Sequence, residues 1–156
     1  MELSDLRTER RIEVRCPPGA LYDLVTDVTN MGQWSPVCRA CWWDEGAGPA
    51  VGSWFTGRNE RDGRVWEARC EVVTAEPGSE FAWMVGGTET GTVWWSYRFA
   101  ATEGGTEVTE CWRVVRLHPL MGETPEALAE MKARTEAGMD ETLAQLRRTA
   151  EGRPAG

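Results

Sequence analysis

Residues 124–149, TPEALAEMKARTEAGMDETLAQLRRT, constrain the architecture more strongly than any other stretch. Thr124 followed by Pro125 is typical of a helix start, because the hydroxyl caps free backbone N–H groups and proline suits the first turn. Apolar or small side chains then recur every three or four residues, on one helix face. That face comprises Leu128, Met131, Thr135, Met139, Thr142, Leu143 and Leu146, with Glu126, Glu130, Lys132, Arg134 and Arg147 outside it. A long helix with one such face must pack against another layer.

The sequence from residue 37 to residue 116 predicts that this layer is an antiparallel sheet. Glycine-containing turns at residues 44–46, 61–63, 76–78, 85–87 and 103–105 separate short runs rich in β-branched and aromatic residues. Connections this short join antiparallel neighbours. The predicted strands are residues 38–44, 52–61, 64–75, 80–85, 91–101 and 106–116. Residues 11–15 alternate polar and apolar side chains and add a seventh strand.

Two short helices are predicted between the first strand and the second. Pro17 and Pro18 suit a helix start, and apolar residues follow at helical spacing. Asn30 is predicted to cap a second helix that contains Trp34. This element order predicts an α+β fold in which a seven-stranded antiparallel curved sheet wraps around the long C-terminal helix. A bent sheet closed by one helix leaves space between them, so the topology also predicts a ligand cavity.

Length and composition predict one domain that does not cross a membrane. The 156 residues fit a single domain over residues 1–150, and residues 151–156 carry no apolar anchor and are predicted to be a disordered tail. No apolar run approaches the roughly 20 residues of a membrane span. The N-terminus lacks the order of a secretory signal, and an odd number of five cysteines suits a reducing compartment, which predicts the cytoplasm. We expect a monomer, or a homodimer paired through an edge strand near residues 80–85.

Several classes of function are excluded by what the sequence contains. A net charge of −8 opposes nucleic acid. Cys38 and Cys41 form one C-x-x-C, but a zinc site needs two more ligands and His118 is the single histidine, so no metal is expected. The sequence contains no dinucleotide fingerprint, P-loop or nucleophile elbow, so no cofactor is expected.

The aromatic composition predicts a wide, tryptophan-lined interior. The chain has nine tryptophans against three phenylalanines and two tyrosines. Tryptophan is large and carries an N–H group that needs a partner, so this number exceeds the needs of a closely packed core. The alternative is that several lie half-exposed on the convex sheet face, and we expect this of about a third of them.

Several segments resemble a known family when they are taken together in order. They are YDLVTDVTNM at residues 22–31, WSP at 34–36, FTGRN at 55–59 and GGTEVTECW at 104–112. In these segments the chain resembles actinobacterial polyketide cyclase/dehydrase-like proteins of the START-like superfamily, also called SRPBCC. The resemblance implies a helix-grip fold whose cavity serves sterols, lipids, polyketides, plant hormones or quinones, sometimes catalytically. It does not specify a reaction.

Strand alternation predicts which side chains face the cavity. Val108 is expected to point inward, so Glu110 and Trp112 share its face. The same rule selects alternate residues on the other strands, and the helices add a few more. The predicted ligand-binding residues are Trp34, Phe55, Asn59, Trp66, Cys70, Trp83, Trp95, Tyr97, Trp112, Met131, Thr135 and Met139.

Glu110 is the predicted catalytic candidate. A carboxyl group buried against tryptophans is harder to ionise, so it acts as a proton donor or as an anchor for a ligand hydroxyl. The alternative is an ion pair with an arginine on a neighbouring strand. His118 is a second candidate acid/base group, because the loop before the long helix can approach the cavity entrance; the alternative is a solvated loop histidine.

The residues leave three interpretations of function. The leading one is binding of a small hydrophobic or aromatic molecule, polyketide-, lipid- or quinone-like, with Glu110, Asn59 and Tyr97 as the polar groups that orient it. The second is a cofactor-independent polyketide cyclase, aromatase or dehydratase with Glu110 as general acid/base. The third is a protein-interaction module, which requires a contiguous exposed apolar patch.

Overall fold

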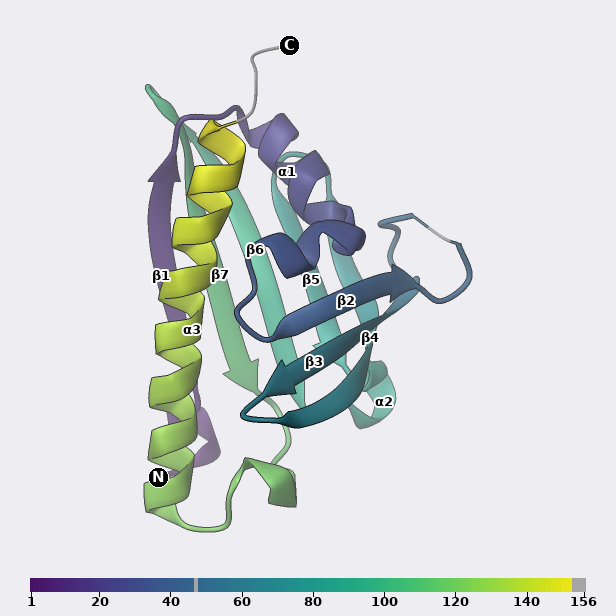
Figure 1. Ribbon diagram of the computed structural model, residues 1–156, viewed down its shortest axis with the longest axis vertical. Helices are drawn as coiled ribbons and strands as arrows, with labels where there is room; N and C mark the ends of the chain where they lie inside the picture. Colours follow the sequence, from purple (N-terminus) through teal and green to yellow (C-terminus); the bar gives the residue numbers. More distant parts are fainter. Residues whose placement is uncertain (47, 153–156) are drawn as a thin grey trace.

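The computed structural model describes residues 1–46 and 48–152, which form one seven-stranded antiparallel sheet and a long C-terminal helix (Figure 1). The strands are β1 (Arg7–Val14), β2 (Cys38–Trp43), β3 (Trp54–Arg61), β4 (Arg64–Glu76), β5 (Glu80–Val85), β6 (Val93–Thr102) and β7 (Gly105–Val114). Their order in the sheet is β1-β7-β6-β5-β4-β3-β2. The helices are α1 (Pro18–Thr26), α2 (Gly87–Thr90) and α3 (Pro125–Glu151), with 3-10 helices η1 (Leu3–Asp5), η2 (Val28–Gln33) and η3 (Pro119–Met121). The predicted α+β helix-grip fold is confirmed.

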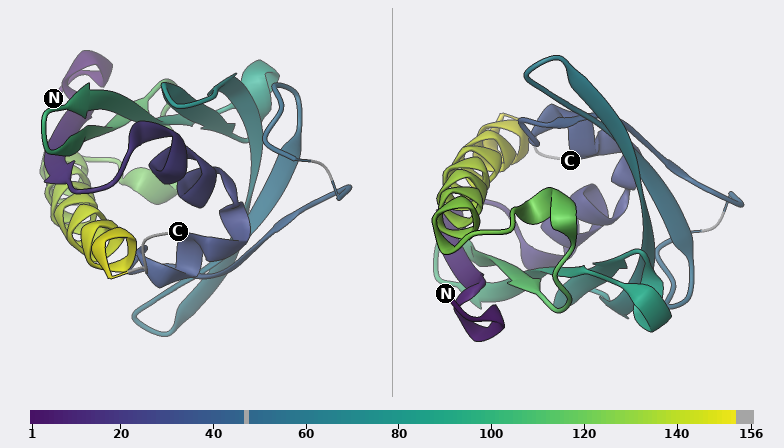
Figure 2. Two further views of the ribbon diagram at one scale, coloured as in Figure 1. Left: turned by 90° about the horizontal axis from the view of Figure 1, so that it is seen from above. Right: turned by 90° about the horizontal axis from the view of Figure 1, so that it is seen from below.

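The sheet is strongly curved. Seen along the long axis, it bends around the interior, with α3 along one side and α1 and η2 on another (Figure 2). Register shifts between Val72 and Thr74 of β4 and between Cys38 and Ala40 of β2 mark irregularities in the ladder. Such bulges bend a strand and increase its twist. They occur in the half of the sheet where β2 and β3 turn across the direction of the other strands (Figure 1).

Polar contacts attach α3 to β1 along one edge of the sheet. The Thr8 hydroxyl donates to the Glu136 carboxylate at 2.8 Å, and Arg10 lies 3.3 Å from Glu136 and 3.4 Å from Asp140. Lys132 donates to the Asp5 carbonyl at 2.9 Å. The helix is therefore held beside the edge strand over several turns.

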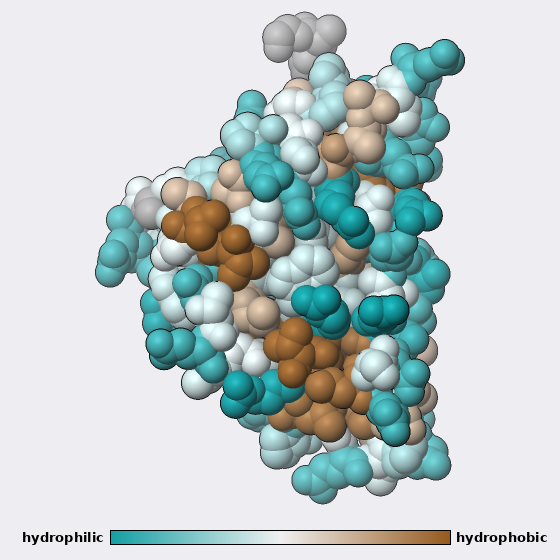
Figure 3. Space-filling model, turned by 180° about the vertical axis from the view of Figure 1, so that it is seen from behind, coloured by the Kyte–Doolittle hydropathy of each residue, from teal (hydrophilic) through white to brown (hydrophobic). Residues whose placement is uncertain are grey.

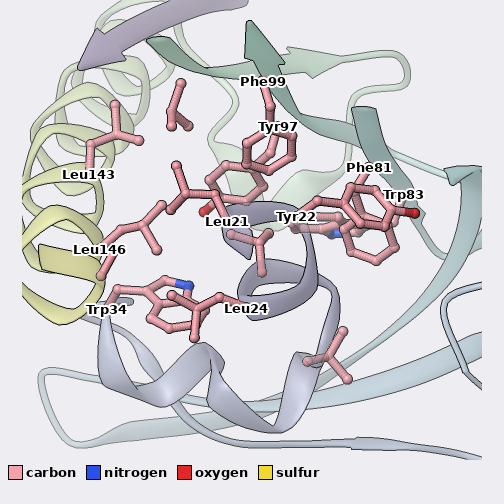
Figure 4. Close-up of a cluster of buried hydrophobic side chains, with 14 of the residues drawn as sticks. Leu21, Tyr22, Leu24, Trp34, Phe81, Trp83, Tyr97, Phe99, Leu143 and Leu146 are labelled. Carbon is pink, nitrogen blue, oxygen red and sulfur yellow. The ribbon is translucent and has the colours of Figure 1, made fainter. Parts of the chain in front are cut away.

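A hydrophobic core fills the interior near the C-terminal end of α3. Leu143 and Leu146 of α3 face Leu21 and Leu24 of α1, and the aromatic rings of β5 and β6 close the cluster from the sheet side (Figure 4). A second, smaller cluster lies near the start of α3. Its buried members are Leu6, Trp112, Val114, Leu128 and Met139.

Arginine side chains cover the tryptophans of the outer sheet face. Trp42, Trp54 and Trp94 are half-buried there, a third of the nine tryptophans, as expected. The guanidinium carbons lie 5.5, 4.5 and 4.7 Å from the ring centroids in the pairs Arg58–Trp42, Arg69–Trp54 and Arg113–Trp94. Each pair is in the range of a cation–π interaction. On the face seen from behind, apolar residues gather in patches separated by polar ones (Figure 3).

Three expectations about the chain's elements need correction. The strand at 80–85 is β5, which lies between β4 and β6 in the middle of the sheet, so it offers no edge for a dimer; the edges are β1 and β2. The first strand begins at Arg7, because buried Leu6 anchors its start. Glu151 belongs to α3 and accepts a hydrogen bond from the Arg15 N–H at 2.9 Å, so it is not in a tail. Residues 153–156 of the expected tail lie outside the described residues.

None of the helices within the described ranges is both long enough and apolar enough to cross a membrane.

The packing of α3 predicts a large cost for truncating Leu146, which is fully buried. Leu146→Ala should lower the free energy of unfolding by about 3 kcal/mol, because the lost apolar contacts leave a cavity. Urea denaturation followed by circular dichroism measures the change. Leu120→Ala removes the same atoms from a side chain that is 71% exposed and should shift the midpoint little. Equal effects of the two substitutions would contradict this description of the core.

Candidate functional site

A cavity of about 230 Å³ lies between the sheet, α3 and the segment that joins η2 to β2. Side chains of both hydrophobic clusters reach it, so it marks the region that neither cluster fills. Predicted site residues that line it are Phe55, Asn59, Trp66, Cys70, Trp83, Trp95, Tyr97, Glu110, Thr135 and Met139. Strand alternation and helical spacing therefore bring these residues to one cavity.

Four predicted site residues lie elsewhere. Trp34 is 2% exposed and packs in the larger core cluster instead of lining the cavity. Trp112 and Met131 belong to the smaller cluster beneath the start of α3. His118 is exposed, and its Nδ1 accepts a hydrogen bond from the Leu120 N–H at the start of η3. The prediction that these side chains reach the cavity is not met, because each is used in local packing or capping.

Two arginines line the cavity that were not among the predicted site residues. Arg61 shares the face of Phe55, Gly57 and Asn59, so one more step of strand alternation would have identified it. Arg134 was expected on the outer side of α3, yet it lines the cavity together with Gly138, one turn further along the helix. Its charge suggested a solvent-facing position, whereas its spacing fits the cavity face.

Other lining residues come from segments without a periodic pattern or from positions not singled out as site residues. They are Met31, Ser35, Pro36, Val37, Cys38, Gly57, Ala68, Val85, Gly138 and Thr142. Gly57 leaves the sheet bare at the cavity wall, since a Cβ atom added there would meet only Asn59 Oδ1, at 3.8 Å. Part of the cavity therefore results from a missing side chain in the middle of β3.

Glu110 is the most unusual group in the cavity wall. It is 4% exposed, and its Oε1 has no hydrogen-bond partner among the described residues. Burial raises the pKa of its carboxyl to about 8, and Asp140 adds to the increase, while a hydrogen-bonding interaction with Tyr97 acts in the opposite direction. At pH 7 the group is therefore mainly a neutral carboxylic acid that has a proton to donate.

The neighbours of Glu110 do not neutralise it as an ion pair. Arg10 is its partner in the β1–β7 ladder, but that guanidinium pairs with Glu136 and Asp140 of α3. No ion pair between described residues involves Glu110. Tyr97 is its partner on the β6 side, and burial, together with Glu110, holds the pKa of its phenol well above the usual value. Both groups are therefore protonated donors near neutral pH.

Cys38 and Cys41 are three residues apart, which in a regular strand would place them on opposite faces. The register shift between Cys38 and Ala40 brings them to the same side of β2. Both are buried, and Cys38 reaches the cavity. A hydrogen bond with Cys41 lowers the pKa of the Cys38 thiol, whereas burial raises the pKa of Cys70 to about 12. In the described part of the chain, no group of three or more histidine, cysteine, aspartate or glutamate side chains is placed to hold a metal ion.

Comparison with solved structures supports the family identified from sequence segments. The Polyketide_cyc-like protein Cgl2372 of Corynebacterium glutamicum is 40% identical, with a TM-score of 0.64 over 94% of this chain and 91% of that one. The di-domain ARO/CYC StfQ of the steffimycin biosynthetic pathway is 17% identical, with a TM-score of 0.75 over 95% of this chain and 51% of that one. Protein NE0264 of Nitrosomonas europaea is 14% identical, with a TM-score of 0.71 over 96% of both chains. The last two similarities concern the fold alone.

No curated protein matches the chain. The sequence model of the family described as "Polyketide cyclase / dehydrase and lipid transport" matches residues 5–151, which is nearly the whole chain. Together with the 40% identity to Cgl2372, this match agrees with the curved sheet, the long helix and the cavity between them. The chain therefore belongs to the polyketide cyclase/dehydrase and lipid transport family.

Proposed function

We propose that this protein binds a small, mainly aromatic molecule in the cavity and orients it by a hydrogen bond from Glu110. The observation that carries the proposal is a buried carboxyl oxygen without a partner at the wall of an apolar cavity. A buried polar atom left unsatisfied costs free energy, and a ligand hydroxyl or carbonyl would satisfy it. Tyr97 and Asn59 offer further polar atoms on the same wall.

The size and walls of the cavity favour a flat ring system. An engineered apolar cavity of roughly 150 Å³ holds benzene, so a cavity of about 230 Å³ suits roughly two fused rings. Trp83 and Trp95 stack with their ring centroids 6.4 Å apart, and Phe55 meets Trp83 edge to face at 5.6 Å. These indoles present apolar faces on which an aromatic ligand can stack.

The location of the protein in the cytoplasm and its oligomeric state, monomer or homodimer, remain predictions.

A side chain that fills the cavity should weaken the binding of an aromatic ligand. Gly57→Val adds a side chain at the bare wall, and its backbone is extended, so the substitution introduces no strain from a positive φ. Isothermal titration with 2-naphthol should give binding to the natural protein and a loss of at least about tenfold in affinity, or 1.4 kcal/mol, in the variant. Ala100→Val adds two carbon atoms, one fewer than Gly57→Val, at an exposed position of β6 and should bind normally. Unchanged binding by Gly57→Val would show that 2-naphthol binds elsewhere.

The raised pKa of Glu110 predicts how stability changes with pH. The folded protein keeps a proton on Glu110 up to about pH 8, whereas the unfolded chain loses it near 4.5. Stability should therefore fall as pH rises through this window, by about 5 kcal/mol at most. Glu110→Gln has no proton to lose, so the difference between natural and variant unfolding free energies should change from pH 5 to pH 9.

Urea denaturation across this pH range measures that difference. Glu107→Gln removes an exposed carboxylate from the same strand and should leave the pH dependence close to that of the natural protein. Parallel curves for the natural protein and Glu110→Gln would mean that Glu110 ionises normally in the folded state, and the proposed donor role would then be wrong.

A second candidate function is cofactor-independent cyclisation or dehydration of a polyketide-like substrate. The same neutral carboxyl favours it, because a group with a pKa of about 8 can both donate and accept a proton near neutral pH. Donation to a hydroxyl would let it leave as water, and the resulting carboxylate would accept a proton from the adjacent carbon. Tyr97 would stabilise the carboxylate between the two steps.

Glu110→Gln separates the two candidate functions. Glutamine keeps the size and hydrogen-bonding capacity of the side chain but cannot transfer a proton. A binding protein should lose at most about tenfold in affinity for 2-naphthol. An enzyme should lose about 10² to 10⁴ in turnover of a β-hydroxyketone substrate, followed by loss of its absorbance change or by mass spectrometry, while binding persists. Equal turnover by both proteins would exclude Glu110 as the acid/base group.

A further inference from the structure

Two arginines at the edge of the cavity come from different elements. Arg61 is the last residue of β3, and Arg134 lies in the first half of α3; both side chains line the cavity. Arg61 Nη2 lies 4.0 Å from the position that a Cβ atom on Gly138 would occupy, so its guanidinium reaches the helix surface. Gly138 is one turn after Arg134 on the same helix face. The two cationic side chains are thus directed to one stretch of the cavity edge.

Neither arginine has a counter-ion in the part of the chain that the structure describes. Arg10, Arg58 and Arg69 each pair with a carboxylate, and other arginines stack on tryptophan rings. Among the described residues, the side chains of Arg61 and Arg134 take part in no ion pair, hydrogen bond or ring contact. The chain has 25 acidic residues and a net charge of −8, so carboxylates are abundant on the molecule. Two unpaired cations at the cavity edge therefore stand out against the surrounding charge.

We infer that the ligand carries a carboxylate, which is bound between Arg61 and Arg134 while its ring system fills the cavity. This inference rests on the proposed function, because it names the class of molecule that the same cavity binds. A guanidinium matches a carboxylate with two parallel N–H donors, and such charge-assisted hydrogen bonds are stronger than neutral ones. Glu110 lies on the strand wall and does not repel the anion as long as it is protonated. The ligand class is an aromatic acid with a hydroxyl or carbonyl on its ring system.

The partial exposure of both arginines makes the predicted interaction sensitive to salt. Arg61 is half-buried and Arg134 is exposed, so dissolved ions can screen their charges. Binding of a carboxylate should weaken as salt concentration rises, whereas binding of a neutral ligand of the same shape should change little. Salt dependence therefore separates the contribution of the arginines from that of the apolar walls.

The experiment compares an acid with its neutral isostere. Isothermal titration at 20 mM salt is performed with 6-hydroxy-2-naphthoate and with 6-hydroxy-2-naphthamide, which differ only in charge and terminal group. The natural protein should bind the acid at least about tenfold more tightly, a difference that corresponds to about 1.4 kcal/mol. Arg61→Gln and Arg134→Gln should each reduce this preference at least about threefold, and the double variant should abolish it.

Arg147→Gln is the matched control, because Arg147 is an exposed arginine of α3 that does not line the cavity. It removes the same charge from the same helix and should leave the preference unchanged. Arg61→Lys keeps a charge without the planar fork and should retain part of the preference, which also tests whether loss in Arg61→Gln reflects misfolding. Circular dichroism of each variant checks the fold.

The outcomes separate this inference from the proposed function. Equal affinities of the natural protein for acid and amide, or a preference that survives the double variant, would overturn the carboxylate site and leave the binding function standing. If neither compound binds the natural protein, the proposed function fails and the inference fails with it. A preference lost equally in Arg147→Gln would assign the effect to overall charge and would also overturn the site.

Discussion

The position of α3 against the edge strand β1 is the constraint on which the rest of the structure depends. Thr8, Arg10 and the Asp5 carbonyl hold the helix beside this edge through Glu136, Asp140 and Lys132. At its C-terminal end, Leu143 and Leu146 close the interior together with α1. In this stretch α3 presents the small side chain of Thr135 and the bare backbone of Gly138 to the cavity, and these do not fill the distance to the sheet. The cavity is the volume left by a helix fixed at one edge and at one end.

The same arrangement explains why Glu110 has no partner on one oxygen. Its neighbour Arg10 would be the obvious counter-ion across the ladder, but the attachment of α3 uses that guanidinium. Without an ion pair, a carboxyl group in an apolar wall is more stable when protonated. The protonation state of Glu110 therefore depends on the contacts that hold α3 against β1. Family membership fits the ligand binding or cyclisation proposed above.

The sequence was informative where periodicity is strong. Alternation along β3 and β6 identified Phe55, Asn59 and Tyr97 as inward residues, and helical spacing identified Thr135 and Met139. Periodicity did not identify lining residues at the ends of elements or in non-periodic segments, because no repeating pattern extends to those positions.

Arg134 was missed because its charge was given more weight than its spacing, and Arg61 because alternation along β3 was followed only as far as Asn59. Trp34 and Trp112 share the inward direction of the cavity residues but lie at different heights along the interior, in the core clusters. Periodicity predicts a face of an element, not the position along it at which packing ends and empty space begins. Local patterns also gave no signal for the pairing of β1 with β7, because it joins residues distant in sequence, whereas β5 pairs with its chain neighbours β4 and β6.

The stacked pair Trp83–Trp95 has an optical consequence. Their rings are inclined by only 21° at 6.4 Å, close enough for the transition dipoles of the two indoles to couple. Coupled chromophores in a fixed chiral arrangement give paired positive and negative bands in circular dichroism, which depend steeply on the angle between the rings. Both indoles border the cavity, while the tryptophans of the outer face are held against arginines. The protein therefore carries an intrinsic spectroscopic signature of its interior that is distinct from the signal of its surface tryptophans.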